Sequence, residues 1–404
     1  MEQIEHVAVI GAGVMGSGIA ALMANSGLTV TLLDLDPAIA QGAVARQLKS
    51  GGIVDAAAAA RICTGSSSKD LACLADADWI VEAASENLEI KSRIFAAVDA
   101  VRKSGSIVSS NTSTFCLSQL LEGVNPGCAG DYLITHFFNP PQTMRLLELV
   151  DGPQTRRQAV EAIVELAQSR LGRCVVDCKD TPGFIANRIG NFWMAVALDE
   201  AVAANVAVED ADAILGGPFG TPMGIFALLD LVGIDLLPVG WQSLRSSLPD
   251  NDPFQVYPAR PALVDSMIAR GLIGRKAGEG FYRRDPDGRW SVIDLASGEY
   301  RDRRPAKVPE INQDGLAGLM DDPSSVAHYA RRVMIRTLAY AAARLGEIAD
   351  STESIDTAMR EGYGWKKGPF ALIASLDARW LHDALDASGI AVPHYLRTGI
   401  EGAR

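Results

Sequence analysis

One histidine and one carboxylate, His136 and Glu148, are the residues of this chain best suited to moving a proton. They lie twelve residues apart in two apolar runs, residues 132–138 and 144–150, which are predicted to be short strands. Asn139-Pro140-Pro141 separates the runs and cannot continue a central strand, because proline lacks the backbone N–H and fixes φ. A tight return there would let Glu148 reach the ring of His136. A carboxylate on one ring nitrogen leaves the other to accept a proton, which is half of an alcohol oxidation.

The other half of an alcohol oxidation is acceptance of a hydride, and the N-terminus carries a pattern typical of a dinucleotide site. A buried-strand pattern, residues 6–10, is followed by a Gly-x-Gly-x-x-Gly turn, a helical pattern and a second strand, residues 29–33. The first glycine makes the turn, the second lets backbone approach a pyrophosphate, and the third allows close helix–strand packing. The predicted cofactor-binding residues of this turn are Gly11, Gly13, Val14, Met15 and Gly16.

Asp34, at the end of the second strand, indicates which dinucleotide to expect. A carboxylate there accepts hydrogen bonds from ribose hydroxyls and repels a 2′-phosphate, and Leu35-Asp36 adds no arginine. NAD is therefore favoured over NADP. FAD is a minor alternative, because flavins use the same fingerprint. A glycine-rich turn in an unrelated α/β domain is the alternative without a cofactor.

Two further buried strands, residues 79–83 and 106–110, continue the β/α alternation of a parallel sheet. A polar cluster follows each strand: Ser85-Glu86-Asn87 with Lys91, and Asn111-Thr112-Ser113-Thr114. Because open α/β sheets bind ligands off the carboxyl ends of their strands, these side chains are candidates for a site. Helix capping and a solvated Glu86–Lys91 surface pair would explain them without a ligand.

The composition narrows the functional class. The chain has 404 residues, enough for two or three domains, with 48% apolar residues, 21% charged residues and a formal net charge of −12. This acidity argues against nucleic acid or an anionic membrane as a main partner. The six cysteines show no zinc-binding spacing, so no metal site is predicted. The absence of a basic leader and of a membrane-length apolar run, with cysteines expected to be reduced, favours the cytoplasm.

Several motifs occur in one order along the first 190 residues. They are the glycine turn of residues 11–16, Glu82-Ala83 with Glu86-Asn87-Leu88, Ser110-Asn111-Thr112-Ser113, His136-Phe137-Phe138-Asn139-Pro140 with Glu148, and Lys179-Asp180-Thr181-Pro182-Gly183-Phe184 with Asn187-Arg188. This order closely resembles the L-3-hydroxyacyl-CoA dehydrogenase family, over the chain from its N-terminus to about Tyr282.

The resemblance assigns roles residue by residue. It implies that His136 is the catalytic base and Glu148 its paired carboxylate, and that Ser113 and Asn187 hydrogen-bond the reacting oxygen. Asn139 matches a nearby polar residue of the substrate site. The residues that it implies for the cofactor site, besides those of the glycine turn, are Asp34, Glu86, Lys91 and Asn111.

The activity that the resemblance implies is reversible, NAD-dependent oxidation of (S)-3-hydroxyacyl-CoA to 3-ketoacyl-CoA, as in fatty-acid β-oxidation. One alternative is a small non-CoA 3-hydroxy substrate, as in L-carnitine and L-gulonate dehydrogenases, which have a similar His/Glu pair. Another is a nucleotide-binding scaffold without turnover. Arg46 and Lys49 could meet a phosphate of coenzyme A, although a solvated helix face explains them equally well.

Beyond Thr181-Pro182-Gly183 the pattern changes to the helical period, so an all-α part should follow the α/β Rossmann-type domain. The predicted domains are an NAD-binding domain over 1–180, a helical domain over 181–282, a linker with small hairpins over 283–322 and a second helical repeat over 323–404. The repeat is predicted because Ala211-Asp212-Ala213-Ile214 and residues 224–228 are echoed 144 residues later.

The second copy has Arg331-Arg332 where a counterpart of Asn187 would stand, so we expect it to be structural. A fused copy could cover the face through which single-copy family members pair, which would give an internal pseudo-dimer that is monomeric; a homodimer is the alternative. This plan is similar to the dehydrogenase part of bacterial multifunctional fatty-acid oxidation proteins, without their hydratase part.

Overall fold

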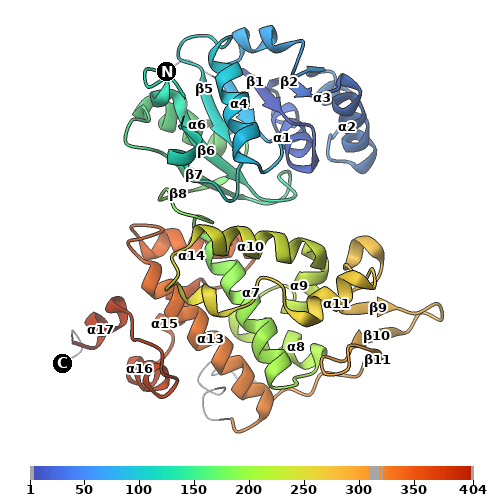
Figure 1. Ribbon diagram of the computed structural model, residues 1–404, viewed down its shortest axis with the longest axis vertical. Helices are drawn as coiled ribbons and strands as arrows, with labels where there is room; N and C mark the ends of the chain where they lie inside the picture. The colour runs from blue at the N-terminus through green and yellow to red at the C-terminus, as the bar shows by residue number, and fades with distance from the viewer. Residues whose placement is uncertain (1–3, 123, 310–318, 320–321, 402–404) are drawn as a thin grey trace. The chain divides into compact units, whose positions relative to one another are not determined.

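The computed structural model describes residues 4–122, 124–309, 319 and 322–401, and the chain forms two compact units, Met1–Phe184 and Ile185–Arg404 (Figure 1). Residues 310–318, 320–321 and 402–404, which belong to the predicted linker and second repeat, lie outside the described part.

The first unit is built on one eight-stranded sheet with the strand order β3-β2-β1-β4-β5-β6-β7-β8. Neighbouring strands are parallel except for β6 and β7, so β7 and β8 run against the other six. The strands are β1 (His6–Ile10), β2 (Thr29–Asp34), β3 (Ile62–Ser66), β4 (Trp79–Glu82), β5 (Ile107–Ser110), β6 (Tyr132–Phe137), β7 (Leu146–Val150) and β8 (Cys174–Cys178). The order of the first six is that of a Rossmann fold, as predicted.

The helices of this unit follow the strands as crossover connections, which parallel neighbours require. They are α1 (Val14–Asn25), α2 (Pro37–Ser50), α3 (Ala56–Ala59), α4 (Leu88–Asp99), α5 (Leu117–Leu120) and α6 (Arg157–Ser169), with 3₁₀ turns η1 (Leu71–Asp76) and η2 (Ala129–Asp131). The central strands are buried on both faces, and α1 and α6 contribute to the same apolar core.

The glycine turn joins β1 to α1 with no room for side chains at two of its positions. Gly11 has φ +104°, and a Cβ there would lie 2.5 Å from the carbonyl oxygen of Ala83. A Cβ on Gly16 would lie 1.8 Å from the carbonyl oxygen of Gly11. The turn therefore closes tightly over the ends of β1 and β4, where the strand order reverses and open α/β sheets bind ligands.

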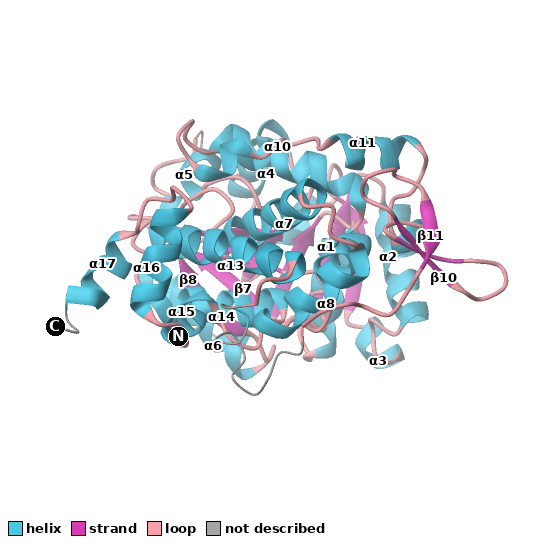
Figure 2. Cartoon of the chain, turned by 90° about the horizontal axis from the view of Figure 1, so that it is seen from below, coloured by secondary structure: helices cyan, strands magenta, loops and turns pink. Residues whose placement is uncertain are grey.

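The second unit is mainly helical and includes a small antiparallel sheet of order β11-β10-β9 (Figure 2). Its helices are α7 (Ala186–Ala203), α8 (Val208–Phe219), α9 (Ile225–Val232), α10 (Leu237–Ser247), α11 (Ala262–Ala269), α13 (Ser325–Arg344), α14 (Thr352–Tyr363), α15 (Pro369–Ala374), α16 (Ala378–Ala387) and α17 (His394–Glu401). The strands β9 (Tyr282–Arg284), β10 (Trp290–Ile293) and β11 (Tyr300–Asp302) lie where small hairpins are predicted, and Gly288 and Gly298 take positive φ in their turns.

Left-handed residues bound α7 at both ends. Phe184 has φ 48° and Asn205 has φ 47°, and α7 runs between them from Ala186 to Ala203. A residue in the left-handed region cannot continue a right-handed helix.

The echo predicted between residues near 212 and 356 corresponds to one local structure that occurs twice. The carboxylate of Asp212 accepts hydrogen bonds from the backbone N–H groups of Phe226 and Ala227, at 2.7 and 3.1 Å, at the start of α9. Asp356 does the same for Phe370 and Ala371 at the start of α15, at 2.7 and 2.8 Å. In both places a glycine precedes the capped helix, and its missing side chain makes room for the aspartate.

Helices α13 and α14 pack on those of the first helical part of this unit. Helix α13 packs against α7 and α8, and the ring of Tyr340 on α13 stacks on Phe192 of α7 at 3.9 Å. The fully buried Arg188 of α7 pairs with Asp252 at 2.7 Å and with Glu347 at 2.9 Å. Charge pairing as well as apolar packing therefore joins the two helical parts.

Among the described residues, no single helix is long and apolar enough to span a bilayer; Ile225–Val232 and Ile234–Ser247 pass such a test only as a pair, bent by 80°.

Candidate active site

His136 and Glu148 are cross-strand neighbours on β6 and β7. Their Cα atoms are register partners, and Oε2 of Glu148 lies 2.7 Å from Nδ1 of His136. Both side chains are buried, and Phe138 and Phe184 pack against the imidazole with ring centroids 4.6 and 5.6 Å away. In the neutral ring, Nδ1–H donates to the carboxylate and Nε2 is the acceptor, as a general base requires.

The turn after His136 packs on the glycine-turn helix. A Cβ on Gly18 of α1 would lie 2.6 Å from the ring of Pro141, so α1 approaches this turn closely. Gln142 donates to Gln47 of α2 at 2.9 Å, and Gln47 donates to Ser17 of α1 at 3.0 Å. These contacts tie the end of the strand that carries the histidine to the elements around the predicted dinucleotide site.

The glycine turn and Asp34 form a backbone cradle at the end of β2. Oδ2 of Asp34 accepts from the N–H of Ala12 at 2.7 Å, and Oδ1 accepts from Leu35 at 2.8 Å, which holds the carboxylate beside the turn. A Cβ at Gly13 would meet no protein atom within 4 Å, so the space beside it is open to a ligand. Val14, at the start of α1, is 71% exposed. This open helix start fits a pyrophosphate, and the fixed carboxylate fits a ribose without a 2′-phosphate.

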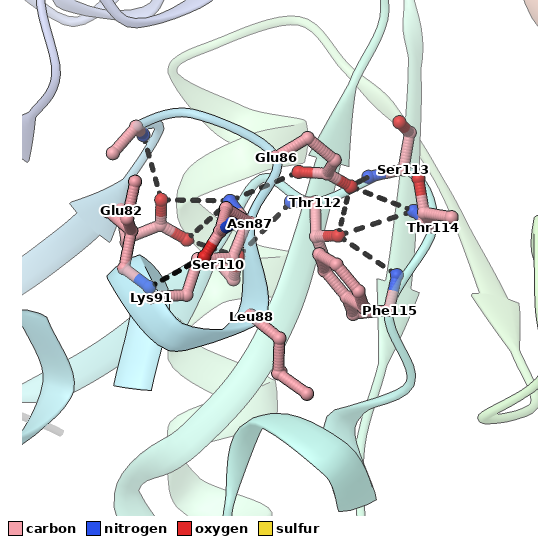
Figure 3. Close-up of polar contacts among 12 residues, drawn as sticks. Glu82, Glu86, Asn87, Leu88, Lys91, Ser110, Thr112, Ser113, Thr114 and Phe115 are labelled. Atoms are coloured by element: carbon pink, nitrogen blue, oxygen red, sulfur yellow. Dashed lines mark hydrogen bonds and ion pairs between the residues drawn. The ribbon is translucent and has the colours of Figure 1, made fainter. Parts of the chain in front are cut away.

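A buried lysine organises the polar clusters at the ends of β4 and β5 (Figure 3). Nζ of Lys91 donates to both oxygens of Glu82, at 2.9 and 3.0 Å, and pairs with Glu86 at 3.1 Å. The Lys91 side chain is only 1% exposed, so a solvated Glu86–Lys91 surface pair is wrong for this site. The hydroxyl of Ser110 also donates to Oε2 of Glu82, at 2.5 Å.

Glu86 holds the loop that carries Ser113 (Figure 3). Its Oε1 accepts from the hydroxyl of Thr112 at 2.6 Å and from the backbone N–H groups of Ser113 and Thr114 at 3.1 Å each. Burial raises the pKa of Glu86, but the charge of Lys91 and these hydrogen bonds outweigh it, so the pKa lies below its ordinary value. Glu86 is therefore a carboxylate at neutral pH, fixed by the lysine behind it.

The predicted site residues differ in where their side chains lie. Asn111 accepts from the N–H of Phe137 at 2.8 Å, which places it beside the histidine strand, and Ser113 is half-buried in its loop. Asn139 is exposed just after β6. Asn187 belongs to the second unit, in the first turn of α7.

Sequence reasoning gave Glu82 no role, although it neutralises Lys91. The signal was available, since a carboxylate at the end of a buried apolar strand needs a cationic partner. Lys91 pairs with Glu82 and Glu86. A direct contact between Lys91 and a cofactor stays a prediction. Among the described residues no group of three or more His, Cys, Asp or Glu side chains is suited to holding a metal ion.

These features define a class. A Rossmann sheet, an open glycine cradle with an acidic strand end, and a histidine–carboxylate pair on the same sheet are the parts of a nicotinamide-dependent dehydrogenase domain.

Comparison with known families gives the particular family. Residues 6–181 match the 3-hydroxyacyl-CoA dehydrogenase NAD binding domain, and residues 183–284 match the C-terminal domain of the same family. The chain belongs to the 3-hydroxyacyl-CoA dehydrogenase family, which confirms the resemblance, the fold class and the presence of an NAD-binding domain.

Individual relatives are consistent with this family. A probable 3-hydroxyacyl-CoA dehydrogenase of Deinococcus radiodurans is 34% identical over 70% of this chain and 84% of its own. A putative fatty acid oxidation complex trifunctional enzyme of Rickettsia felis is 33% identical over 98% of this chain and 56% of its own. The crystal structure of 3-hydroxybutyryl-CoA dehydrogenase from Escherichia coli shares the fold over 98% of both chains, with a TM-score of 0.76 at 24% identity. Three curated relatives match over 98% of this chain, and the chain spans about half of their length, 54 to 56%.

Proposed function

We propose that this chain catalyses the reversible, NAD-dependent oxidation of (S)-3-hydroxyacyl-CoA to 3-ketoacyl-CoA, a reaction of fatty-acid β-oxidation. The observation that carries the proposal is the 2.7 Å contact between the buried His136 and Glu148, on strands tied to the dinucleotide cradle. Family membership supplies the substrate class.

The chemistry of the chain's own residues follows from that contact. Nε2 of His136 takes the proton of the 3-hydroxyl, and Glu148 stabilises the imidazolium through Nδ1. The glycine turn of residues 11–16 and Asp34 would hold NAD, which would supply the acceptor for the hydride of C3. The hydroxyl of Ser113 donates to the reacting oxygen, which gains negative charge as the proton leaves. In the reverse direction the imidazolium returns its proton to the oxygen of the 3-keto group.

Other side chains have supporting parts in this proposal. Asp34 accepts from the ribose hydroxyls, and Glu86 and Asn111 line the cofactor site while Lys91 holds Glu86. Asn187 as a second donor to the reacting oxygen, and Asn139 as a substrate contact, rest on the family motif. Coenzyme A contacts at Arg46 and Lys49 rest on charge alone.

The test is NADH oxidation with a series of 3-ketoacyl-CoA lengths, for wild type and His136→Ala. The variant should lose about 10²- to 10⁴-fold in kcat, as expected for loss of a general base. His382→Ala is the matched control, since His382 is a half-exposed histidine on α16. Full activity of His136→Ala would overturn the mechanism. Turnover of free 3-hydroxy acids but not of thioesters would favour a carnitine- or gulonate-type substrate, and no turnover of either would favour a scaffold.

We further propose that the protein acts in the cytoplasm, with small molecules rather than nucleic acid or membrane as its ligands. The packing of α13 on α7 supports a chain that is monomeric, its two helical copies paired internally, and a homodimer is the alternative. Sedimentation equilibrium distinguishes the two, and an obligate dimer through α7 would contradict the internal pairing.

A further inference from the structure

The second helical copy places one side chain against the family's predicted substrate-binding asparagine. Tyr363 is the last residue of α14, and its hydroxyl lies 3.5 Å from Oδ1 of Asn187, in the first turn of α7. The two residues are 176 positions apart in the chain. This distance is at the long end for a hydrogen bond. The packing around Tyr363 therefore has to show whether its hydroxyl is held beside Asn187.

Those surroundings are shaped around the tyrosine. Gly190 lies three residues after Asn187 on α7, and a Cβ there would be 2.0 Å from Cζ and 2.3 Å from the hydroxyl oxygen of Tyr363. One turn further, Trp193 packs edge-on against the same ring, with centroids 6.4 Å apart and an interplanar angle of 82°. Helix neighbours three residues apart lie on adjoining parts of the surface. The glycine thus makes room for the ring and the tryptophan steadies it.

This placement matters because an asparagine amide has two chemically opposite ends. Its oxygen only accepts hydrogen bonds and its nitrogen only donates them. A hydroxyl that donates to Oδ1 favours the rotamer in which the nitrogen points elsewhere. A reacting alcohol or carbonyl oxygen that gains negative charge needs donors, so the nitrogen is the useful end.

We propose that Tyr363 is a positioning residue that orients the Asn187 amide, so that its nitrogen is presented to the reacting oxygen. The inference rests on the proposed function, because it assumes that Asn187 binds that oxygen. It gives the second helical copy a part in catalysis, in addition to covering α7. On this proposal the second copy is not purely structural, in contrast to the expectation from the sequence.

A double-mutant cycle tests the proposal in the full-length chain, with Tyr363→Phe, Asn187→Ala and their combination. Tyr363→Phe keeps the ring against Gly190 and removes only the hydroxyl. We expect kcat/KM for acetoacetyl-CoA to fall about three- to tenfold, in line with one hydrogen bond, and KM for NADH to stay unchanged. In the Asn187→Ala background the same change should have no further effect, because the amide that it orients is gone.

Tyr329→Phe is the matched control. Tyr329 also comes from the second copy and donates its hydroxyl to α7, to the backbone oxygen of Ala197 at 3.1 Å. Its loss should lower Tm without changing kcat/KM.

Losses from Tyr363→Phe and Asn187→Ala that multiply independently, or no loss from Tyr363→Phe, would overturn the inference while leaving the proposed dehydrogenase standing. Absence of wild-type turnover with every 3-ketoacyl-CoA would overturn both.

Discussion

Glu148 lies directly opposite His136 on the neighbouring antiparallel strand, with its Oε2 2.7 Å from Nδ1 of the ring. Facing positions in an antiparallel pair bring side chains on one face together, so the strand register alone sets this contact. Because a slip by one residue would turn either side chain to the other face, the pair depends on the register of the whole β6–β7 hairpin.

Glu148→Gln tests the charge of this pair with little change in shape. The glutamine can still hydrogen-bond Nδ1, but it cannot stabilise an imidazolium, so kcat for acetoacetyl-CoA reduction should fall on the order of 10²-fold. Glu161→Gln, on the exposed face of α6, is the control and should be silent. A loss below about threefold, smaller than that expected for an ordinary hydrogen bond, would contradict a role for the charge.

Lys91→Met tests the buried ion network behind the Ser113 loop. Without the ammonium, the fully buried Glu82 is left uncompensated close to Glu86, and removing one partner of a buried pair costs about 3–5 kcal/mol in the free energy of unfolding. Urea unfolding at pH 7 measures the change. Lys103→Met, whose partner Asp78 is partly exposed, should cost about 0–1 kcal/mol, and equal losses in the two variants would contradict the buried network.

The pH dependence of the Lys91→Met defect has a definite sign. In the wild type the pKa of Glu86 is lowered from its usual 4.5, so its contribution to stability is present above that value and is lost as pH falls through the lower folded value. In the variant, protonation of Glu86 relieves its repulsion with Glu82. The stability gap should therefore narrow on acidification from pH 7 towards pH 4, and a gap that widens would show that another group dominates.

The sequence predicted the elements that depend on local pattern and missed contacts that depend on tertiary packing. The strand before the glycine turn and the two strands around His136 were predicted to within two residues, because turn chemistry and apolar runs are local signals. The burial of Lys91 was not predicted, because whether a lysine near the start of a helix meets solvent depends on how α4 packs over Glu82. The approach of Tyr363 to Asn187 joins residues too far apart in the chain for any spacing rule.

Asp212→Asn tests the repeated capping aspartate of the second unit. Burial raises the pKa of Asp212 to about 6, against the lowering effect of hydrogen bonds from Tyr282, Phe226 and Ala227. An asparagine can accept from only one of the two backbone N–H groups, so the variant should lose about 1–2 kcal/mol of stability at acidic pH. The same substitution at Asp356, which caps α15 in the same way, should also destabilise the chain.

The sign of the pH effect separates this aspartate from an ordinary one. A folded pKa raised above the usual 3.8 gives stability that is present below that pH and is lost as pH rises through about 6. The difference between wild type and Asp212→Asn should therefore shrink from pH 4 to pH 7 in urea titrations. Asp287→Asn is the control, since its exposed carboxylate has a lowered pKa and should show no such decline.

Asp34→Asn tests the choice of dinucleotide. Asp34 accepts a hydrogen bond from the N–H of Ala12 at 2.7 Å, and an asparagine oxygen can keep that bond while the negative charge is removed. Because the charge is what repels a 2′-phosphate, the ratio of kcat/KM for NADH to that for NADPH should fall about tenfold, equivalent to about 1.4 kcal/mol. Asp36→Asn is the control, since Asp36 caps α2 two residues further on and should leave the ratio unchanged. If both variants shift the ratio equally, general electrostatics rather than the strand-end carboxylate sets the preference; if neither does, the shape of the cradle alone selects the cofactor.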